Sequence, residues 1–479
     1  MRKWIFPVIL AVFLAVAASA IWYALRPSPR RAVFLIVVDT LRADRLSSYG
    51  YAANSTVNIS SLADRGVLFE NAQANASWTV PSMGSLMTSL YPGELGLVEK
   101  PAAPGEQFEW NERREQIRYT LTLSTTTLAE VFTNNGFHTA GFVNQPALNN
   151  RDGFVQGFDD WFYPAGSDSV IRRNPRVPLL DDALTRKRTT LWDDVDRTDS
   201  ALVGSFEKWL SSAPTEDLFV WVHLLSPHKP YAPPPEFATG RRAASTRGLD
   251  VNSDNYDGEV RYTDHLVGRL LRAIDAHVGL NHSIVILTSD HGEEFGEHGM
   301  ADHGHSLHRE VVHVPLIISA PGLPGGKRVD SPVRLIDVFP TILSLCELSG
   351  PESADIRGID LVPLTRGQVS GLDVFAEGML YGSTERAVQA GDFRLMWDEE
   401  YDDYRLFRPS TDAGETEDVS QRYGEESRML RELLDHYHIK IAERYTEHTR
   451  GYSSADSLEA AKERERVLKA MKSLGYVGD

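Results

Sequence analysis

The sequence contains a single cysteine, Cys346, within an apolar segment. One cysteine excludes an intrachain disulfide and a zinc cluster built from cysteines. Glycine and proline, at 36 and 25 of 479 residues, are too few for a collagen-like or low-complexity chain. With 42% apolar and 24% charged residues, the composition is that of a folded globular protein.

Positive charge is also scarce, since 49 lysines and arginines stand against 67 acidic residues and leave a net charge of −18. A chain with this balance repels the phosphates of nucleic acids at long range. Nucleic acid is therefore not expected as a partner, and the sequence does not indicate an oligomeric state.

Long apolar runs are limited to one, from Trp4 to Leu25, which lies between Arg2-Lys3 and Arg26. This run is long enough to cross the hydrocarbon core of a bilayer, roughly 30 Å. Residues 1–31 are therefore predicted to anchor the protein in a membrane, with the rest outside the cytoplasm, in the periplasm or at the cell surface. Ala18-Ser19-Ala20 also resembles a signal-peptidase site, and cleavage after Ala20 would give a secreted protein instead.

Shorter apolar runs alternate with helix-like segments along the following chain. The runs at 32–38, 218–222, 283–287 and 314–318 are typical of strands that are covered on both faces. Helical periodicity is present at 127–135 and 262–277. The alternation predicts an α/β fold with a large, mostly parallel mixed β-sheet covered by helices on both faces.

The alternation stops near residue 380. Hairpin-like strands around 393–397 and 404–407 then precede polar helices. Residues 380–479 are predicted to form a smaller C-terminal α+β subdomain with a short antiparallel sheet and a helical tail. Polar segments at 163–198 and 229–255 are predicted to be surface loops that shape a substrate entrance.

Ionisable side chains directly follow two of the apolar runs. Asp39 follows the first run, and Asp290 with His291 follows the run at 283–287. Because ligands bind at the carboxyl ends of strands in open α/β sheets, these three residues are candidates for one site. Carboxylate oxygen and imidazole nitrogen together suit Zn²⁺ or Mn²⁺. The alternative is that each aspartate only caps a helix or turn.

Histidine is concentrated after Asp290, where six of the fifteen histidines lie. They are His291, His298, His303, His305, His308 and His313. Some of them would be metal ligands and others proton donors, whereas the alternative is a polar surface loop.

Thr79 precedes a helical pattern that has Pro81 in its first turn and apolar residues at Met83, Leu86 and Met87. The N-terminus of a helix favours a bound anion such as a phosphoryl or sulfuryl group. A hydroxyl bound to a divalent metal loses its proton more easily and becomes a nucleophile. The alternative is that Thr79 or Ser77 is a plain N-cap.

Taken together, these segments resemble the sulfatase family of the alkaline-phosphatase superfamily. The resemblance runs from about residue 32 to the end of the chain and implies an alkaline-phosphatase-like sandwich, in which residues 32–379 form the sulfatase-like catalytic domain. The matching blocks are Val37-Val38-Asp39, Tyr49-Gly50, Thr79-Val80-Pro81-Ser82, Pro227-His228-Lys229-Pro230-Tyr231, Ser289-Asp290-His291-Gly292-Glu293, Val314-Pro315-Leu316-Ile317 and Asp337-Val338-Phe339-Pro340-Thr341.

The chain departs from the sulfatase pattern at several positions. Arylsulfatases carry a cysteine that is oxidised to formylglycine and followed by Pro-x-Arg, but this chain has Thr79 and Met83 there. Thr40 replaces the usual second aspartate of the metal pair, and 143–146 replaces a block that holds sulfate. A threonine nucleophile resembles the branch of the superfamily that cleaves or transfers phosphoesters.

The resemblance implies a single divalent metal ion, Zn²⁺ or Mn²⁺ ahead of Ca²⁺. Its ligands would be Asp39, Thr79, Asp290 and His291. One ion is expected because Leu224 stands where two-zinc diesterases have a further aspartate.

The resemblance also implies a covalent mechanism, in which Thr79 attacks the ester and water or an acceptor alcohol releases the intermediate. His228 and His303 are candidates for stabilising charge and protonating the leaving group, with His305 as the alternative to His303. His223 fits a buried core histidine as well as it fits a residue of the site. Arg42 and Asp264 are expected to be structural.

The expected function is therefore hydrolysis of phosphate, phosphonate or sulfate esters, on an anionic substrate such as a glycan or lipid headgroup. One alternative is a membrane-surface transferase of a phospho-headgroup, although such transferases usually have several membrane spans. The other is a non-catalytic relative that binds an anionic glycan, against which the intact Asp39, Thr79, Asp290 and His291 argue.

Overall fold

The computed structural model describes residues 31–98, 121, 125–148, 153–163, 195–214, 216–238, 249–350, 356–368, 372–381 and 384–449. Within them, the strands of the largest sheet are β1 (Ala32–Val38), β2 (Val67–Gln73), β3 (His138–Val143), β4 (Asp160–Phe162), β5 (Leu218–Leu224), β6 (Ser283–Ser289), β9 (Leu316–Ser319) and β10 (Lys327–Arg334). Their order is β10-β2-β9-β6-β1-β5-β3-β4. Only β9 runs antiparallel to its neighbours β2 and β6, so the predicted mostly parallel mixed sheet is confirmed.

Each of the four apolar runs forms a strand of this sheet. β1 spans the predicted residues and is buried at every position. β5 and β6 each extend two residues beyond the predicted run. β9 begins only at Leu316, because Pro315 before it has no N–H to donate to a ladder.

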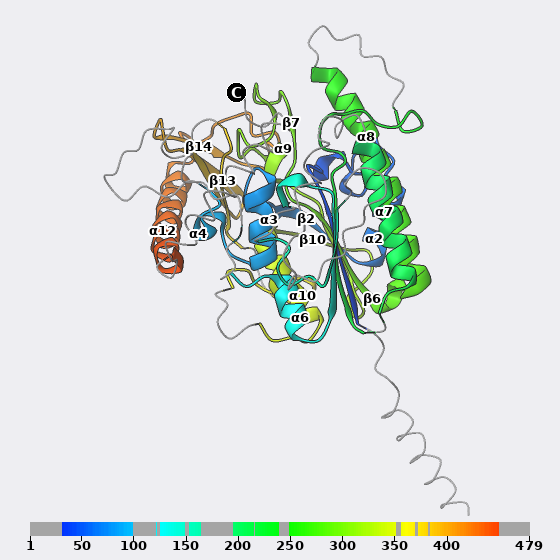
Figure 1. The fold of residues 1–479 in the computed structure, drawn as a ribbon. Helices are drawn as coiled ribbons and strands as arrows, with labels where there is room; N and C mark the ends of the chain where they lie inside the picture. Colours follow the sequence, from blue (N-terminus) through cyan, green and yellow to red (C-terminus); the bar gives the residue numbers. More distant parts are fainter. Residues whose placement is uncertain are drawn as a thin grey trace, which may run out of the picture.

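Helices cover both faces of the sheet (Figure 1). On one face lie α2 (Val57–Arg65), α7 (Val195–Ser211) and α8 (Leu249–His277), and on the other lie α3 (Thr79–Thr88), α6 (Leu128–Asn134) and α10 (Val338–Leu345). Side chains of β1 alternate between the two cores, with Leu35 packed in one and Ile36 in the other. The predicted sandwich is therefore confirmed.

The helix predicted at 127–135 is present, but the one predicted at 262–277 begins much earlier. Thr127 caps α6 by accepting a hydrogen bond from the Glu130 N–H. α8 begins at Leu249, because Tyr256 and Val260 are buried and continue its apolar face. The last residues of the predicted loops 163–198 and 229–255 therefore belong to the starts of α7 and α8. Most of the other residues of these loops lie outside the described residues.

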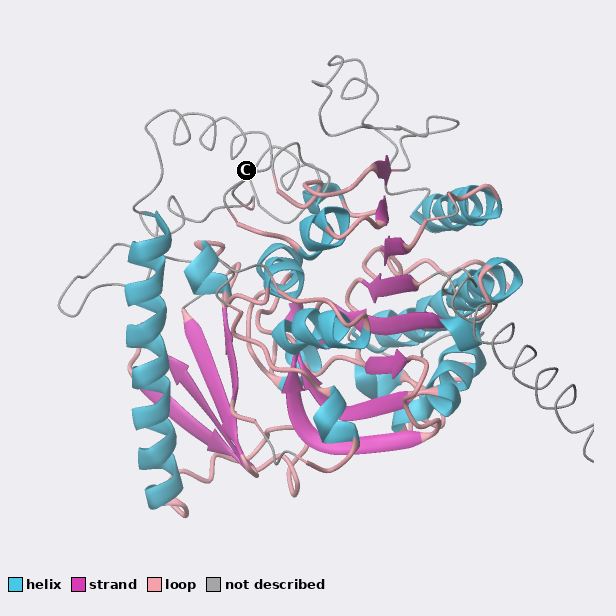
Figure 2. Cartoon of the chain, turned by 90° about the horizontal axis from the view of Figure 1, so that it is seen from below, coloured by secondary structure: helices cyan, strands magenta, loops and turns pink. Residues whose placement is uncertain are grey.

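A second, antiparallel sheet consists of β11 (Val374–Glu377), β12 (Glu385–Ala390), β13 (Phe393–Asp398) and β14 (Asp403–Phe407). Figure 2 shows this sheet beside the larger one, with a long helix along its outer side. That helix is α12 (Gly424–Thr449), whose Leu434 and Tyr437 pack with Val388 and Leu395. The predicted hairpin and short antiparallel sheet are confirmed, whereas the domain boundary at residue 380 stays a prediction.

The membrane anchoring predicted from the sequence is corrected by the structure. No helix in the described ranges is long and apolar enough to cross a bilayer. The two longest helices, α8 and α12, carry charged residues along their length. The run Trp4–Leu25 and the sequence Ala18-Ser19-Ala20, on which the prediction depended, lie outside the described residues.

We expect Phe219→Ala to lower the free energy of unfolding by about 3–5 kcal/mol, because it removes a fully buried ring. The Phe219 ring stacks on Phe132, with centroids 4.5 Å apart. Met429→Ala in α12 is the control, since Met429 is 57% exposed and its loss should change stability by less than about 0.5 kcal/mol. Urea unfolding measures both variants, and equal losses would contradict the assignment of the core.

Candidate active site

The register of three neighbouring strands positions the site. Val38 at the end of β1 pairs with Ser289 at the end of β6 and with Leu224 at the end of β5. The next residues, Asp39 and Asp290, therefore leave adjacent strands at the same edge of the sheet. The Ser289 hydroxyl holds the two turns together, because it accepts from the Leu41 N–H at 2.9 Å and donates to the His291 carbonyl at 2.6 Å.

Asp39, Asp290 and His291 form a fully buried group. One donor atom from each lies within 4.8 Å of the other two. The His291 Nε2 atom is 3.5 Å from Asp290 Oδ2 and 3.8 Å from Asp39 Oδ1. The structure thus brings together the two strand ends that the sequence marked as candidates.

The donor atoms of this group fit a divalent cation. Asp39 Oδ1 and Asp290 Oδ2 are buried and have no hydrogen-bond partner among the described residues. His291 Nδ1 donates to the Gly292 carbonyl at 2.9 Å, which leaves the lone pair on Nε2, the atom that faces both carboxylates. Two unpaired carboxylate oxygens are costly to bury unless a cation compensates them.

Electrostatics also favour a cation at this position. Burial raises the pKa of Asp290, and the neighbouring Asp39 carboxylate raises it further. Burial acts in the same direction on Asp39, but the hydrogen bond from His223 and the nearby imidazoles of His228 and His291 outweigh it and lower the pKa of that carboxyl. The strain of keeping two adjacent carboxylates ionised would be relieved by bound positive charge.

Gln145 holds the second oxygen of Asp39. Its Nε2 donates to Asp39 Oδ2 at 2.6 Å, and His223 Nε2 lies 3.4 Å from the same oxygen. In the sequence, 143–146 stands out only as a replacement of the sulfate-binding block, and this contact is not predicted. His223 is buried, as expected for a core histidine, yet it also touches the site. Only the pairing of β3 with β5, which places Val143 opposite His223, reveals this proximity.

Thr79 is the first residue of α3, and its hydroxyl lies at the same group. Thr79 Oγ1 is 3.2 Å from His291 Nε2, and the side chain is nearly buried. The N-cap residue is Trp78, and the Ser77 hydroxyl donates to the Gly378 carbonyl at 2.8 Å. The alternative of a plain N-cap is therefore wrong for both Ser77 and Thr79.

Thr40 has an unusual backbone conformation beside the metal-binding group. Its φ is 55°, a region that β-branched residues rarely adopt. This conformation accompanies a hydrogen bond from the Thr40 N–H to Asp290 Oδ1 at 3.2 Å, while its carbonyl accepts from Tyr256. Thr40, with its strained backbone, therefore holds Oδ1 of Asp290, while Oδ2 of the same carboxylate faces His291.

Two further histidines lie next to His291. The His303 ring is 4.5 Å from the His291 ring and 5.3 Å from the His228 ring, between centroids. His303 Nδ1 donates to Glu293 Oε1 at 2.8 Å, and Glu293 also accepts from Tyr231. Burial lowers the pKa of both His228 and His303, and a bound anion would raise it.

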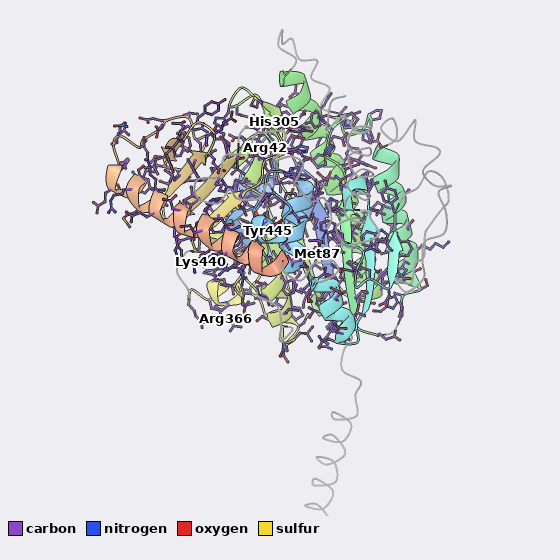
Figure 3. The ribbon with its side chains drawn as sticks, turned by 60° about the vertical axis from the view of Figure 1, so that its left-hand side comes forward. Arg42, Met87, His305, Arg366, Lys440 and Tyr445 are labelled. Carbon is purple, nitrogen blue, oxygen red and sulfur yellow. The ribbon has the colours of Figure 1, made fainter. Side chains whose placement is uncertain are left out.

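His305, the alternative to His303, makes a different ring contact. Its ring stacks on Tyr381 at 4.6 Å between centroids. Arg42, labelled with His305 at the upper end of Figure 3, pairs with Asp44 and Glu297. Asp264 accepts the Ile59 N–H at the start of α2 at 2.8 Å. Arg42 and Asp264 are structural, as expected.

Comparison with known proteins identifies this arrangement. A family profile described as Sulfatase matches residues 31–348. The chain belongs to the sulfatase family. As a member of this family, it is a hydrolase of the sulfuric ester type, and the residues that could hold the divalent metal typical of sulfatases are Asp39, Asp290 and His291.

Proteins of known sequence and structure resemble it over most of its length. An arylsulfatase of Clostridium perfringens is 24% identical, over 84% of this chain and 93% of its own. A protein solved with its substrate D-glucosamine-2-N,6-O-disulfate has a TM-score of 0.66 at 16% identity, covering 87% of this chain and 98% of its own. The phosphonate monoester hydrolase of Agrobacterium radiobacter has a TM-score of 0.64 at 20% identity, and the match covers 88% of this chain and 96% of that hydrolase. The two structures show the shared fold.

We expect Asp290→Asn to weaken binding of Zn²⁺ or Mn²⁺ at this sulfatase site at least about a hundredfold, or about 2.8 kcal/mol. The variant removes a charged oxygen that has no hydrogen-bond partner among the described residues. Asp435→Asn is the control, because Asp435 is exposed on α12. Calorimetric titration of metal-free protein measures both variants. Unchanged affinity in Asp290→Asn, or preference for Ca²⁺ over both transition metals, would contradict the assignment.

Proposed function

We propose that this sulfatase uses Thr79 as its nucleophile and cleaves phosphate or phosphonate esters in preference to sulfate esters. The observation that carries the proposal is the 3.2 Å contact between Thr79 Oγ1 and His291 Nε2, beside two carboxylate oxygens without a hydrogen-bond partner in the described part of the chain. Formylglycine cannot be made at this position, because residue 79 is a threonine, which cannot be oxidised to that aldehyde. The single cysteine, Cys346, is buried in the hydrophobic core.

The proposed nucleophile is held by its helix. Thr79 is the first residue of α3, so the N–H groups of the first turn have no acceptor within the helix and favour an anion there. A divalent ion held by Asp39, Asp290 and His291 would lower the pKa of a bound hydroxyl and attract the anionic ester. Thr79 therefore presents its oxygen where substrate charge is stabilised.

The chemistry proceeds in two substitutions at phosphorus. The deprotonated Thr79 oxygen forms a bond to phosphorus while the bond to the ester oxygen breaks, and the leaving group takes a proton. Water then attacks the phosphothreonine, breaks the bond between Thr79 and phosphorus, and restores the hydroxyl. This cycle needs no group other than the threonine to carry the intermediate.

His228 and His303 would supply the proton. The bound anion would raise the pKa of both imidazoles from the lowered values caused by burial. His303 donates through Nδ1 to Glu293, so its Nε2 would carry the transferable proton when the ring is charged. The buried Glu293 would stabilise that charge.

Preference for phosphorus follows from how the intermediate is released. A formylglycine hydrate ejects sulfate by collapse to the aldehyde, but a threonine ester must be cut by water. The fold is shared with the phosphonate monoester hydrolase of Agrobacterium radiobacter, which supports an active site of this type that accepts phosphorus esters. The helix N-terminus and the metal would favour a phosphate dianion over a sulfate monoanion.

We expect Thr79→Ala to lower kcat at least about 10³-fold, or about 4 kcal/mol of activation free energy, because the attacking atom is removed. Ser77→Ala is the matched control: its hydroxyl is on the same segment but donates to the Gly378 carbonyl. It should keep kcat within about threefold, since one lost hydrogen bond affects stability instead. Steady-state hydrolysis of an aryl phosphate and thermal melting measure both. A small loss in Thr79→Ala would indicate direct attack by water.

We also expect kcat/KM for an aryl phosphate or phosphonate ester to exceed that for the matched aryl sulfate at least about tenfold, or about 1.4 kcal/mol. The comparison uses one leaving group and one metal at a time, so that only the transferred group differs. If the sulfate ester proves the better substrate, the proposed role of Thr79 is wrong and the family activity alone describes the enzyme.

A further inference from the structure

A second group of potential metal ligands lies outside the active site described above. His298 lies between β7 (Glu294–Phe295) and β8 (Ala301–Asp302), His308 precedes α9 (Arg309–Val312), and Glu310 lies within it. One donor atom from each lies within 4.8 Å of the other two. Neither the mechanism nor the sulfatase resemblance uses these three side chains.

We propose that His298, His308 and Glu310 bind a second divalent transition-metal ion, of the Zn²⁺ type. His298 Nε2 and Glu310 Oε2 are buried and have no hydrogen-bond partner among the described residues. They lie 3.4 Å apart. Two donor atoms bound to one tetrahedral Zn²⁺ at about 2.0–2.1 Å lie about 3.3 Å from each other. The spacing thus fits two ligands of one ion.

The hydrogen bond of the His308 ring suits this residue to be the third ligand. Its Nδ1 donates to Glu415 Oε2 at 3.0 Å, which leaves the lone pair on Nε2. The His298 and His308 rings stack in parallel, with centroids 3.4 Å apart and an angle of 5° between their planes, so one ring would have to turn for both Nε2 lone pairs to point at one ion. Glu415 is buried and fixed by Arg394 at 3.0 Å. A carboxylate that orients a ligand histidine is a common feature of zinc sites.

The Glu310 side chain is buried, so a bound cation would lower the free-energy cost of keeping its carboxylate charged. It is 8% exposed, whereas the His298 side chain is 16% exposed, so the site has an edge through which an ion could enter. Burial raises the pKa of Glu294, and the Glu310 and Glu297 carboxylates raise it further, to about 7. The nearby cations are Arg42, which is already paired with Asp44 and Glu297, Arg309, which interacts with Glu310, and Arg394, which interacts with His308.

A metal at this position would have a structural role. It would tie the loop between β7 and β8 to α9, and the residue directly after β8 is His303, next to His291. Three protein ligands leave a fourth position for water. The proposal also revises the expectation of one ion, since a chain with both sites filled would hold two.

The experiment counts Zn²⁺ in full-length protein whose active-site ligands have been removed by Asp39→Asn and Asp290→Asn. After Zn²⁺ loading and gel filtration, elemental analysis should find about one ion per chain. Adding His298→Gln should reduce this to less than about 0.2, and adding Glu310→Gln should act in the same way. Adding His282→Gln, which removes an exposed histidine elsewhere, should leave about one ion.

A second measurement keeps the test valid if the doubly substituted protein does not fold. His298→Gln in the otherwise unchanged chain should bind one Zn²⁺ fewer than the starting protein. Co²⁺ loading should show the loss of one set of visible absorption bands. The proposal is overturned if the background without active-site ligands binds no Zn²⁺, or if its ion survives both His298→Gln and Glu310→Gln.

Discussion

The active site depends on the parallel pairing of β1 with β6. This pairing sets Val38 opposite Ser289, so that Asp39 and Asp290 emerge side by side with their backbones fixed by the sheet. A shift of one residue in register would move one aspartate away from the other and turn its side chain to the opposite face. The buried cores on both faces resist such a shift, because every residue of β1 is covered. Packing of the sheet thereby stabilises two adjacent buried carboxylates.

The elements around this pair supply the rest of the chemistry. α3 brings a hydroxyl at its first residue, and β3 brings Gln145 to the outer oxygen of Asp39. The chain after β8 brings His303. These side chains come from segments far apart in the sequence, and each is held by its own hydrogen bond or helix. The site is therefore preorganised for a metal ion and an anionic ester, and the proposed nucleophile, Thr79, would distinguish this sulfatase from members that use formylglycine.

The sequence predicts the strands and strand ends well because their signal is local. Continuous apolar runs mark β1, β5 and β6, and the ionisable residues after them mark Asp39, Asp290 and His291. The choice between His303 and His305 could not be made from sequence, because it depends on where the loop after β8 turns. Gln145 and the group of His298, His308 and Glu310 need tertiary contacts to be recognised. The predicted membrane placement came from a segment outside the described residues and finds no support in the helices that are described.

The central claim is that Thr79 carries the transferred group during turnover. Its most direct test is acid quenching of the enzyme during hydrolysis of an aryl phosphate, followed by peptide mass spectrometry with fragmentation. The account predicts a phosphoryl group on Thr79, at a level that rises when release is slowed at low temperature and that is absent without substrate. Steady turnover with Thr79 unmodified at every time point, or with the phosphoryl group on another residue, would contradict it.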